Sequence, residues 1–195
     1  MLGTGPRFAR DAFGPVLIFY VGWRLVGFRT GVIAATLVAF SAYAWERRHG
    51  RRGLAIGIGL LIALVQAVAG LATGSTVAYF APAVIINGVY GFAFLVSVLI
   101  GRPLAGVFAA ESYPFTPEIK ASPTFRSVFS VISLVWAAYL LSRAAIRWLT
   151  LTRASVELFI VVNVATGIPI TAAILTWGIW YAFRRFQREL GSPAR

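Results

Sequence analysis

Hydrophobic residues along this chain fall into long runs that are separated by short polar or basic segments. Two of the runs reach the roughly 20 residues that an α-helix needs to cross the hydrocarbon of a bilayer. The pattern predicts an all-α integral membrane bundle of about six transmembrane helices in a single transmembrane domain, 1–195. The predicted spans cover about residues 12–26, 30–45, 53–73, 79–100, 125–149 and 155–183.

The segments between these runs contain the residues that end helices. The triplet Gly27-Phe28-Arg29 predicts a tight connection between the first two spans, and Gly74-Ser75-Thr76 predicts another between the third and fourth. Residues 101–124 contain four prolines with both acids and bases, so we expect one sizeable cytoplasmic loop there. Gly167 and Pro169 predict a kink in the last span, which is longer than a membrane requires.

Composition agrees with a membrane protein and excludes several kinds of chemistry. The chain is 59% hydrophobic and 12% charged, with a mean hydropathy of +0.81, which is unusual for a water-soluble domain. It contains no cysteine, so disulfides, thiolate metal sites and cysteine nucleophiles are excluded. The single histidine, His49, lies in an arginine-rich loop and is expected to be a solvated side chain. We predict no metal site and no cofactor.

The net charge of +12 comes from 18 basic residues, and nearly all of them lie at the ends of the predicted spans. This distribution is typical of the positive-inside rule rather than of a nucleic-acid-binding face. Placing both termini in the cytoplasm leaves just four basic residues outside, Arg24, Arg29, Arg147 and Arg153. We therefore predict a multi-pass protein of the inner (plasma) membrane, with lipid and no nucleic acid as its partner.

An arginine inside the fifth predicted span is the most informative single residue. Arg143 is costly in a membrane unless it is paired or hydrated, and Glu157 is its predicted partner. Trp136, Tyr139, Arg143 and Arg147 recur at three- and four-residue steps, so they share one helix face. This face predicts either a substrate or anion site, or an arginine that extends to the surface while Glu157 neutralises it.

Other polar and aromatic residues lie within the predicted spans and complete the predicted substrate-binding set. For Asn87 and Gln66 we favour hydrogen bonds between helices over chemistry. The deep aromatics either face lipid or form the wall of a cavity that stabilises a cationic species. These residues are Asn87, Tyr90 and Phe94 on one face of the fourth span, Gln66 in the third and Asn163 in the sixth.

Two of the six acidic residues are candidate catalytic groups. Glu46 and Glu157 lie at predicted membrane boundaries, where low dielectric could keep a carboxylic acid protonated and able to donate a proton to a substrate. The alternative is local pairing with Arg47 or Arg143, which we favour.

Several short motifs are shared with a known family, namely Phe80-Ala81-Pro82, Asn87, Ser97, Gly101-Arg102-Pro103-Leu104, Trp136, Arg143 and Gly167 to Pro169. They resemble a bacterial family of multi-pass membrane proteins related to intracellular septation protein A. The resemblance implies a role in envelope maintenance or septation without a defined reaction. The chain is also similar, in size, span number and aromatic content, to small membrane-bound terpene cyclases, which protonate an alkene or epoxide.

Three functions follow from these observations. The first is an intramembrane enzyme, a protonation-initiated terpene or prenyl cyclase that acts on a hydrophobic prenyl or lipid substrate. The second is an anion or small-solute transporter or channel that uses Arg143, Arg147 and interrupted helices. The third is an envelope scaffold that recruits partners through residues 101–124 and the basic ends. We prefer the enzyme narrowly, because deep aromatic residues outnumber polar pathway residues.

Overall fold

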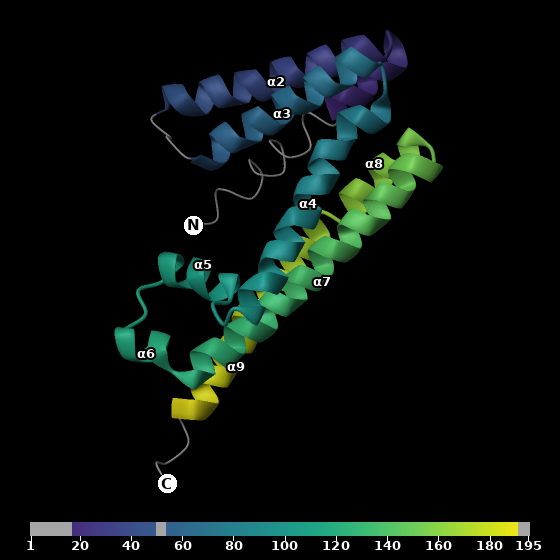
Figure 1. The fold of residues 1–195 in the computed structure, drawn as a ribbon. Helices are drawn as coiled ribbons and strands as arrows, with labels where there is room; N and C mark the ends of the chain where they lie inside the picture. The colour runs from purple at the N-terminus through teal and green to yellow at the C-terminus, as the bar shows by residue number, and fades with distance from the viewer. Residues whose placement is uncertain (1–16, 50–53, 191–195) are drawn as a thin grey trace. The chain divides into compact units, whose positions relative to one another are not determined.

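The computed structural model describes residues 17–49 and 54–190, and every regular element in these residues is an α-helix (Figure 1). The prediction of an all-α protein is confirmed. After a helix at 17–25 the elements are α2 (Phe28–Arg48), α3 (Leu54–Thr73), α4 (Thr76–Leu99), α5 (Leu104–Ser112), α6 (Pro117–Ala121), α7 (Pro123–Arg153), α8 (Val156–Ala165) and α9 (Ile168–Leu190).

Four helical segments are long and apolar enough to cross a membrane. They are Phe28–Trp45, Thr76–Leu99, Pro123–Arg153 and Val156–Arg188, and Gly59–Thr73 forms a shorter apolar helix. Large apolar side chains such as Leu25, Leu99 and Ile179 are largely exposed, as expected where lipid is the solvent. The chain is a helical protein with several candidate membrane spans, and the count of six stays a prediction. The start of the first predicted span, 12–16, lies outside the described residues.

Residues 101–124 contain two short helices rather than an irregular loop. Each helix is bounded by proline, because the residue before a proline is driven out of the helical region. Thr116 and Ser122 are extended and directly precede Pro117 and Pro123. Before these breaks, α5 has the sequence LAGVFAAES, which is rich in the strong helix formers alanine and leucine.

The predicted kink in the last span is a break in the helix. The α8 helix ends at Ala165 and α9 begins at Ile168. Pro169 has no N–H to donate to the Ala165 carbonyl, and its ring would clash with that carbonyl in a continuous helix. In the first turn of α9 the missing N–H costs little.

The chain divides into two compact units, and α4 and α7 each contribute to both. The first unit consists of two chain segments, the residues up to Ile85 and Arg147–Val164. Its centre is aromatic: the Phe19 ring stacks 4.8 Å from Tyr79, and Phe80 lies 4.8 Å from Phe159. Phe19 and Phe159 are fully buried.

The hairpin formed by 17–25 and α2 in the first unit depends on glycine. A Cβ at Gly31 would lie 2.7 Å from the Phe19 carbonyl oxygen, and one at Gly22 would lie 3.0 Å from the Gly31 Cα. The backbones approach too closely for any other residue at Gly31, as in small-residue helix contacts of membranes.

The second unit comprises Ile86–Ile146 and the chain from Ala165 onward. Within it, the end of α4, the first half of α7 and α9 run side by side (Figure 1). Gly91 of α4 allows the close approach of Leu141 of α7, and Gly178 of α9 faces Ile132. Nearer the start of α7, four residues form a buried cluster: Phe125, Val128, Phe129 and Ile132. The cluster packs against Phe115, Trp177, Tyr181 and Phe186, among others.

Candidate functional site

Three of the predicted substrate-binding aromatics lie together in the second unit. The Trp136 ring stacks on Phe94 at 6.1 Å and meets Tyr139 edge-on at 5.9 Å. Tyr139 is buried, and its hydroxyl donates to the Thr166 carbonyl oxygen at 2.7 Å. The Thr171 hydroxyl lies 2.9 Å from the same phenolic oxygen. These contacts stabilise the break between α8 and α9, so a substrate-binding role for the three aromatics stays a prediction.

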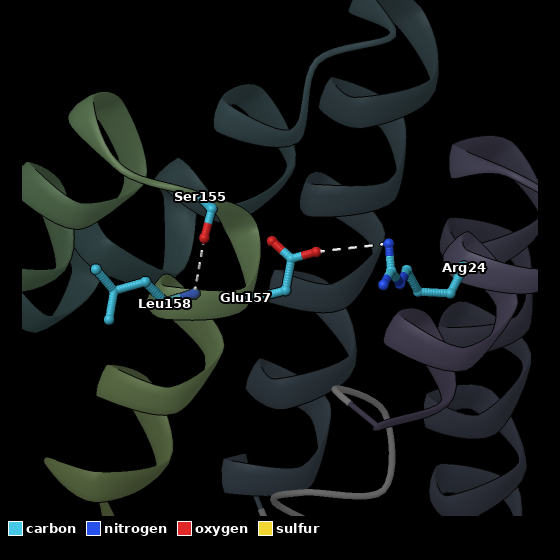
Figure 2. A network of polar contacts seen from close by, with 4 residues as sticks. All are labelled: Arg24, Ser155, Glu157 and Leu158. Carbon is cyan, nitrogen blue, oxygen red and sulfur yellow. Dashed lines mark hydrogen bonds and ion pairs between the residues drawn. The ribbon is translucent and has the colours of Figure 1, made fainter.

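The carboxylate proposed as an acid lies in the first unit. Figure 2 shows Glu157 pointing toward Arg24, with 3.8 Å between Oε1 and Nη1. Both side chains are partly exposed, Arg24 by 61% and Glu157 by 42%. Beside them, the Leu158 N–H donates to Ser155 Oγ at 3.2 Å, so Ser155 is the N-cap of α8. Glu157 therefore has a cationic neighbour at the N-terminus of α8, and its role as a proton donor stays a prediction.

The basic stripe of α7 is divided between the two units. Arg147 belongs to the first unit, is 5% exposed, and places its Cζ 5.3 Å from the Phe159 ring centroid. Arg143 is half-buried and belongs to the second unit. The pairing of Arg143 with Glu157 stays a prediction. The partner of Glu157 that the structure shows, Arg24, agrees with the predicted topology, which places both residues at outer span ends.

The other predicted substrate-binding residues are divided between the two units. Gln66 and Asn163 are half-buried in the first unit, whereas Asn87 and Tyr90 lie in the second, where Tyr90 is exposed. The side chain of Glu46 lies outside the described residues.

A basic cleft of about 730 Å³ lies in the second unit. Its lining residues come from the turn after α4, from the two short helices and from the first turns of α7. Three cationic side chains and three serines contribute to its lining. The lining residues are Gly101, Arg102, Pro103, Gly106, Val107, Ala110, Lys120, Ala121, Ser122, Pro123, Phe125, Arg126, Ser127 and Ser130.

Gly101 ends α4 and gives the basic cleft one of its edges. It has a φ of 74°, its N–H donates to the Val98 carbonyl, and the Arg102 N–H donates to the Ser97 carbonyl at 2.9 Å. This pair of bonds is the Schellman motif, which favours glycine at its left-handed position. A Cβ at Gly101 would overlap the Arg126 guanidinium, lying 2.8 Å from Cζ. The missing side chain therefore lets Arg126 lie against the C-terminus of α4, where a cation is favoured.

Two buried serines hold α5 in place over the cleft. Ser97 Oγ accepts a hydrogen bond from the Leu104 N–H at 3.0 Å, and Ser133 Oγ accepts one from the Ala105 N–H at 3.1 Å. The first N–H groups of a helix have no partner within it. Side chains from α4 and α7 supply those partners here, so one wall of the cleft is fixed to both spanning helices.

The sequence matches, over residues 3–190, a family described as a protein of unknown function, DUF3159. The chain belongs to the DUF3159 family. No curated protein and no solved structure matches it. The family description carries no activity, so the resemblances to septation protein A and to terpene cyclases stay predictions.

All charged residues in the described cleft lining of this DUF3159 protein are basic. Arg102, Lys120 and Arg126 line it, and none of the described lining residues is acidic. The nearest acid along α6, Glu118, is fully exposed. Hydrogen bonds from its own backbone N–H and from the Thr116 hydroxyl hold the pKa of Glu118 below its usual range. Three cations without an acidic partner in the lining attract an anion.

Sequence reasoning treated the cleft cations of this DUF3159 chain as topology signals. Arg102 and Arg126 lie 24 positions apart, and no periodicity connects them across two short helices. The run Gly101-Arg102-Pro103 could have identified Arg102 as a site residue. The glycine ends the helix and the proline restricts the backbone after it, so the position of the arginine at the end of the predicted span is restricted on both sides.

Proposed function

We propose that this chain is a multi-spanning inner-membrane protein that binds an anionic ligand in the basic cleft. The observation that supports the proposal best is that Arg102, Lys120 and Arg126 converge on one cleft from three different segments. The positive-inside rule requires only a number of positive charges near the span ends. It does not require those charges to line one cleft, and three cations that line a cleft without an acid create a positive potential that favours an anion there.

The lining residues have the chemistry that an anion needs. Arg126 is positioned by its contact with the backbone at Gly101, so it is partly ordered before a ligand arrives, which lowers the entropic cost of binding. Ser127 and Ser130 add hydroxyl donors. A guanidinium can bind two oxygens of one oxyanion at once, and an ammonium adds a point charge.

The finer topology belongs to the same proposal. Six spans place both termini and the cleft on the cytoplasmic side, where the positive-inside rule places the larger number of arginines. Four apolar helices long enough to span support a multi-spanning arrangement, and Gly59–Thr73 and the helix at 17–25 are the shorter segments that would complete the six spans.

Anion transport is a second candidate because one spanning segment is discontinuous. The break at 166–167 interrupts Val156–Arg188, and interrupted spans form the binding sites of many transporters. Binding is preferred to transport because the Tyr139 hydroxyl already donates to the Thr166 carbonyl oxygen at this break. Release of trapped phosphate or chloride from proteoliposomes would favour transport.

The prenyl cyclase that the sequence favoured has less support from the geometry. It needs Glu157 or Glu46 as a proton donor next to an aromatic cavity, whereas Glu157 is partly exposed and paired with Arg24. The aromatics Phe94, Trp136 and Tyr139 pack on one another.

Thermal unfolding of the purified full chain in a neutral detergent tests the proposal. Inorganic phosphate, sulfate and phosphatidylglycerol are added separately to the wild type and to the triple variant R102Q/K120Q/R126Q. The control is R184Q/R185Q/R188Q, which removes three charges from α9 outside the cleft lining. At least one anion should stabilise the wild type and the control but not the cleft variant. Equal responses of the two triple variants would overturn the proposal.

A further inference from the structure

We infer that the ligand of the basic cleft is the phosphate headgroup of an anionic membrane lipid. The inference rests on the proposed function and names its ligand. Four features of the second unit support it: the position of the cleft, its apolar border, its size and the sign of its charge.

The cleft lies at the ends of two membrane-spanning helices. Its lining includes Gly101, two residues after the end of α4, and Pro123, the first residue of α7. Both helices are candidate spans. The end of a span lies at the boundary between hydrocarbon and water, where lipid phosphates also lie. A site at this depth meets lipid headgroups before it meets solutes from the cytoplasm.

Apolar side chains border the cations of the cleft. Leu99 and Ile100, directly before Gly101, are 77% and 67% exposed. On α5, Val107 and Phe108 are also exposed, and Val107 lines the cleft. The α5 helix begins at Leu104, five residues after the end of α4 at Leu99, so its exposed apolar side chains lie close in the chain to the end of a candidate span. Acyl chains can contact these side chains while the headgroup contacts the cations.

The size of the cleft favours a headgroup over a bare ion. Its volume of about 730 Å³ is within the range of roughly 300–1,000 Å³ that is common for small-molecule sites. An inorganic phosphate would fill a small part of this space, whereas a glycerophosphate with its attached groups would fill more of it and contact more of the lining.

The sign of the charge selects among lipids. A zwitterionic lipid such as phosphatidylcholine brings a cation next to its phosphate, and none of the described lining residues is an acid that could accept this cation. An anionic lipid with an uncharged alcohol headgroup avoids this repulsion, and its hydroxyls can bond to Ser127 or Ser130. The cleft should therefore prefer phosphatidylglycerol-like lipids to zwitterionic ones.

The test measures lipid retention by native mass spectrometry on the purified full chain in neutral detergent. The probes are dioleoylphosphatidylglycerol, dioleoylphosphatidylcholine and inorganic phosphate. The proteins are the wild type, R126Q, R102Q/K120Q/R126Q and the α9 control R184Q/R185Q/R188Q. Phosphatidylglycerol should bind the wild type and the control alike, about tenfold more weakly to R126Q, and at least a hundredfold more weakly to the cleft triple variant. Phosphatidylcholine should show no dependence on the cleft residues.

The outcomes separate the two proposals. If inorganic phosphate binds as tightly as phosphatidylglycerol and is lost in the cleft variant, the ligand is a soluble anion and the lipid inference is wrong, while anion binding stands. If no probe distinguishes the cleft variant from the α9 control, both proposals are wrong. Should the triple variant fail to fold, K120Q in the exposed helix α6 and R126K, which keeps the charge but loses the guanidinium, provide the same comparison at smaller amplitude.

Discussion

The Tyr139 hydroxyl of α7 donates a hydrogen bond of 2.7 Å to the carbonyl oxygen of Thr166. Thr166 lies in the break between α8 and α9, where helix bonds to main-chain carbonyls are lost. In a membrane interior no water replaces a lost partner. A single phenol from a neighbouring helix therefore stabilises a discontinuous span.

Replacing Tyr139 with phenylalanine should lower the free energy of unfolding by about 1–3 kcal/mol, because the part-buried Thr166 carbonyl oxygen loses a hydrogen-bond donor. Thermal unfolding in detergent measures the effect. The Thr171 hydroxyl shares the network, so Y139F and T171V should be less than additive when combined. Wild-type stability in Y139F would show that the break does not depend on the phenol.

Gly101 and Gly74 form a matched pair for testing the edge of the cleft. Both have positive φ, 74° and 65°, but a Cβ at Gly74 meets nothing within 4 Å, whereas one at Gly101 overlaps Arg126. Alanine at either position should cost about 1–2 kcal/mol through backbone strain. The additional loss in G101A reports the displacement of Arg126, and R126A should remove that additional loss. Equal losses in G101A and G74A would contradict the contact.

Gly31 should not tolerate a side chain, because its Cβ would lie 2.7 Å from the Phe19 carbonyl oxygen. We expect G31A to destabilise the chain by about 2 kcal/mol or more, since neighbouring backbone must move. Gly59 is the control: a Cβ there meets nothing within 4 Å, and G59A should be neutral or gain up to about 1 kcal/mol of helix propensity. Denaturant titration of both variants gives the comparison.

The Arg24–Glu157 pair should contribute little to stability, because both side chains are partly exposed. E157Q should change the free energy of unfolding by about 1 kcal/mol or less. A much larger loss would indicate that Glu157 neutralises a buried charge, as first predicted for Arg143. Measuring E157Q with R24Q and the double variant isolates the coupling between the two residues.

The predicted orientation can be tested by labelling, because the natural chain has no cysteine to interfere. Tyr113 and Ala154 are exposed residues between helices and fall on opposite predicted sides. In spheroplasts, a membrane-impermeant maleimide should label A154C at once and Y113C only after permeabilisation. The reverse pattern would invert the topology, and equal labelling of both would reject an odd number of crossings between them.

The bounds of the long apolar helices could be predicted from sequence to within a few residues. The run 53–73 corresponds to α3, Leu54–Thr73, and the run 79–100 to α4, Thr76–Leu99. This success has a simple cause: apolar runs are bounded by glycine, proline and arginine, whose effects are local. The break at 166–167 was predictable for the same reason, since Pro169 acts on the residue four positions before it.

Contacts between distant segments could not be predicted in this way. Glu157 and Arg24 are 133 positions apart, and an arginine nearer in the pattern was the predicted partner. The basic cleft depends on where two short helices turn the chain between α4 and α7. Such geometry follows from packing, for example from the buried Ser133 that binds the start of α5, and no periodicity encodes it.

The glycine stop of α4 has a consequence for how the sequence can vary. Each residue turns an α-helix by about 100°, so inserting or deleting one residue in α4 rotates Arg102 away from Arg126 and shifts the Ser97 hydroxyl from the start of α5. Side chains facing lipid along α4 can change freely among apolar residues. The length of α4, by contrast, is fixed by the cleft at its end as much as by the thickness of the bilayer.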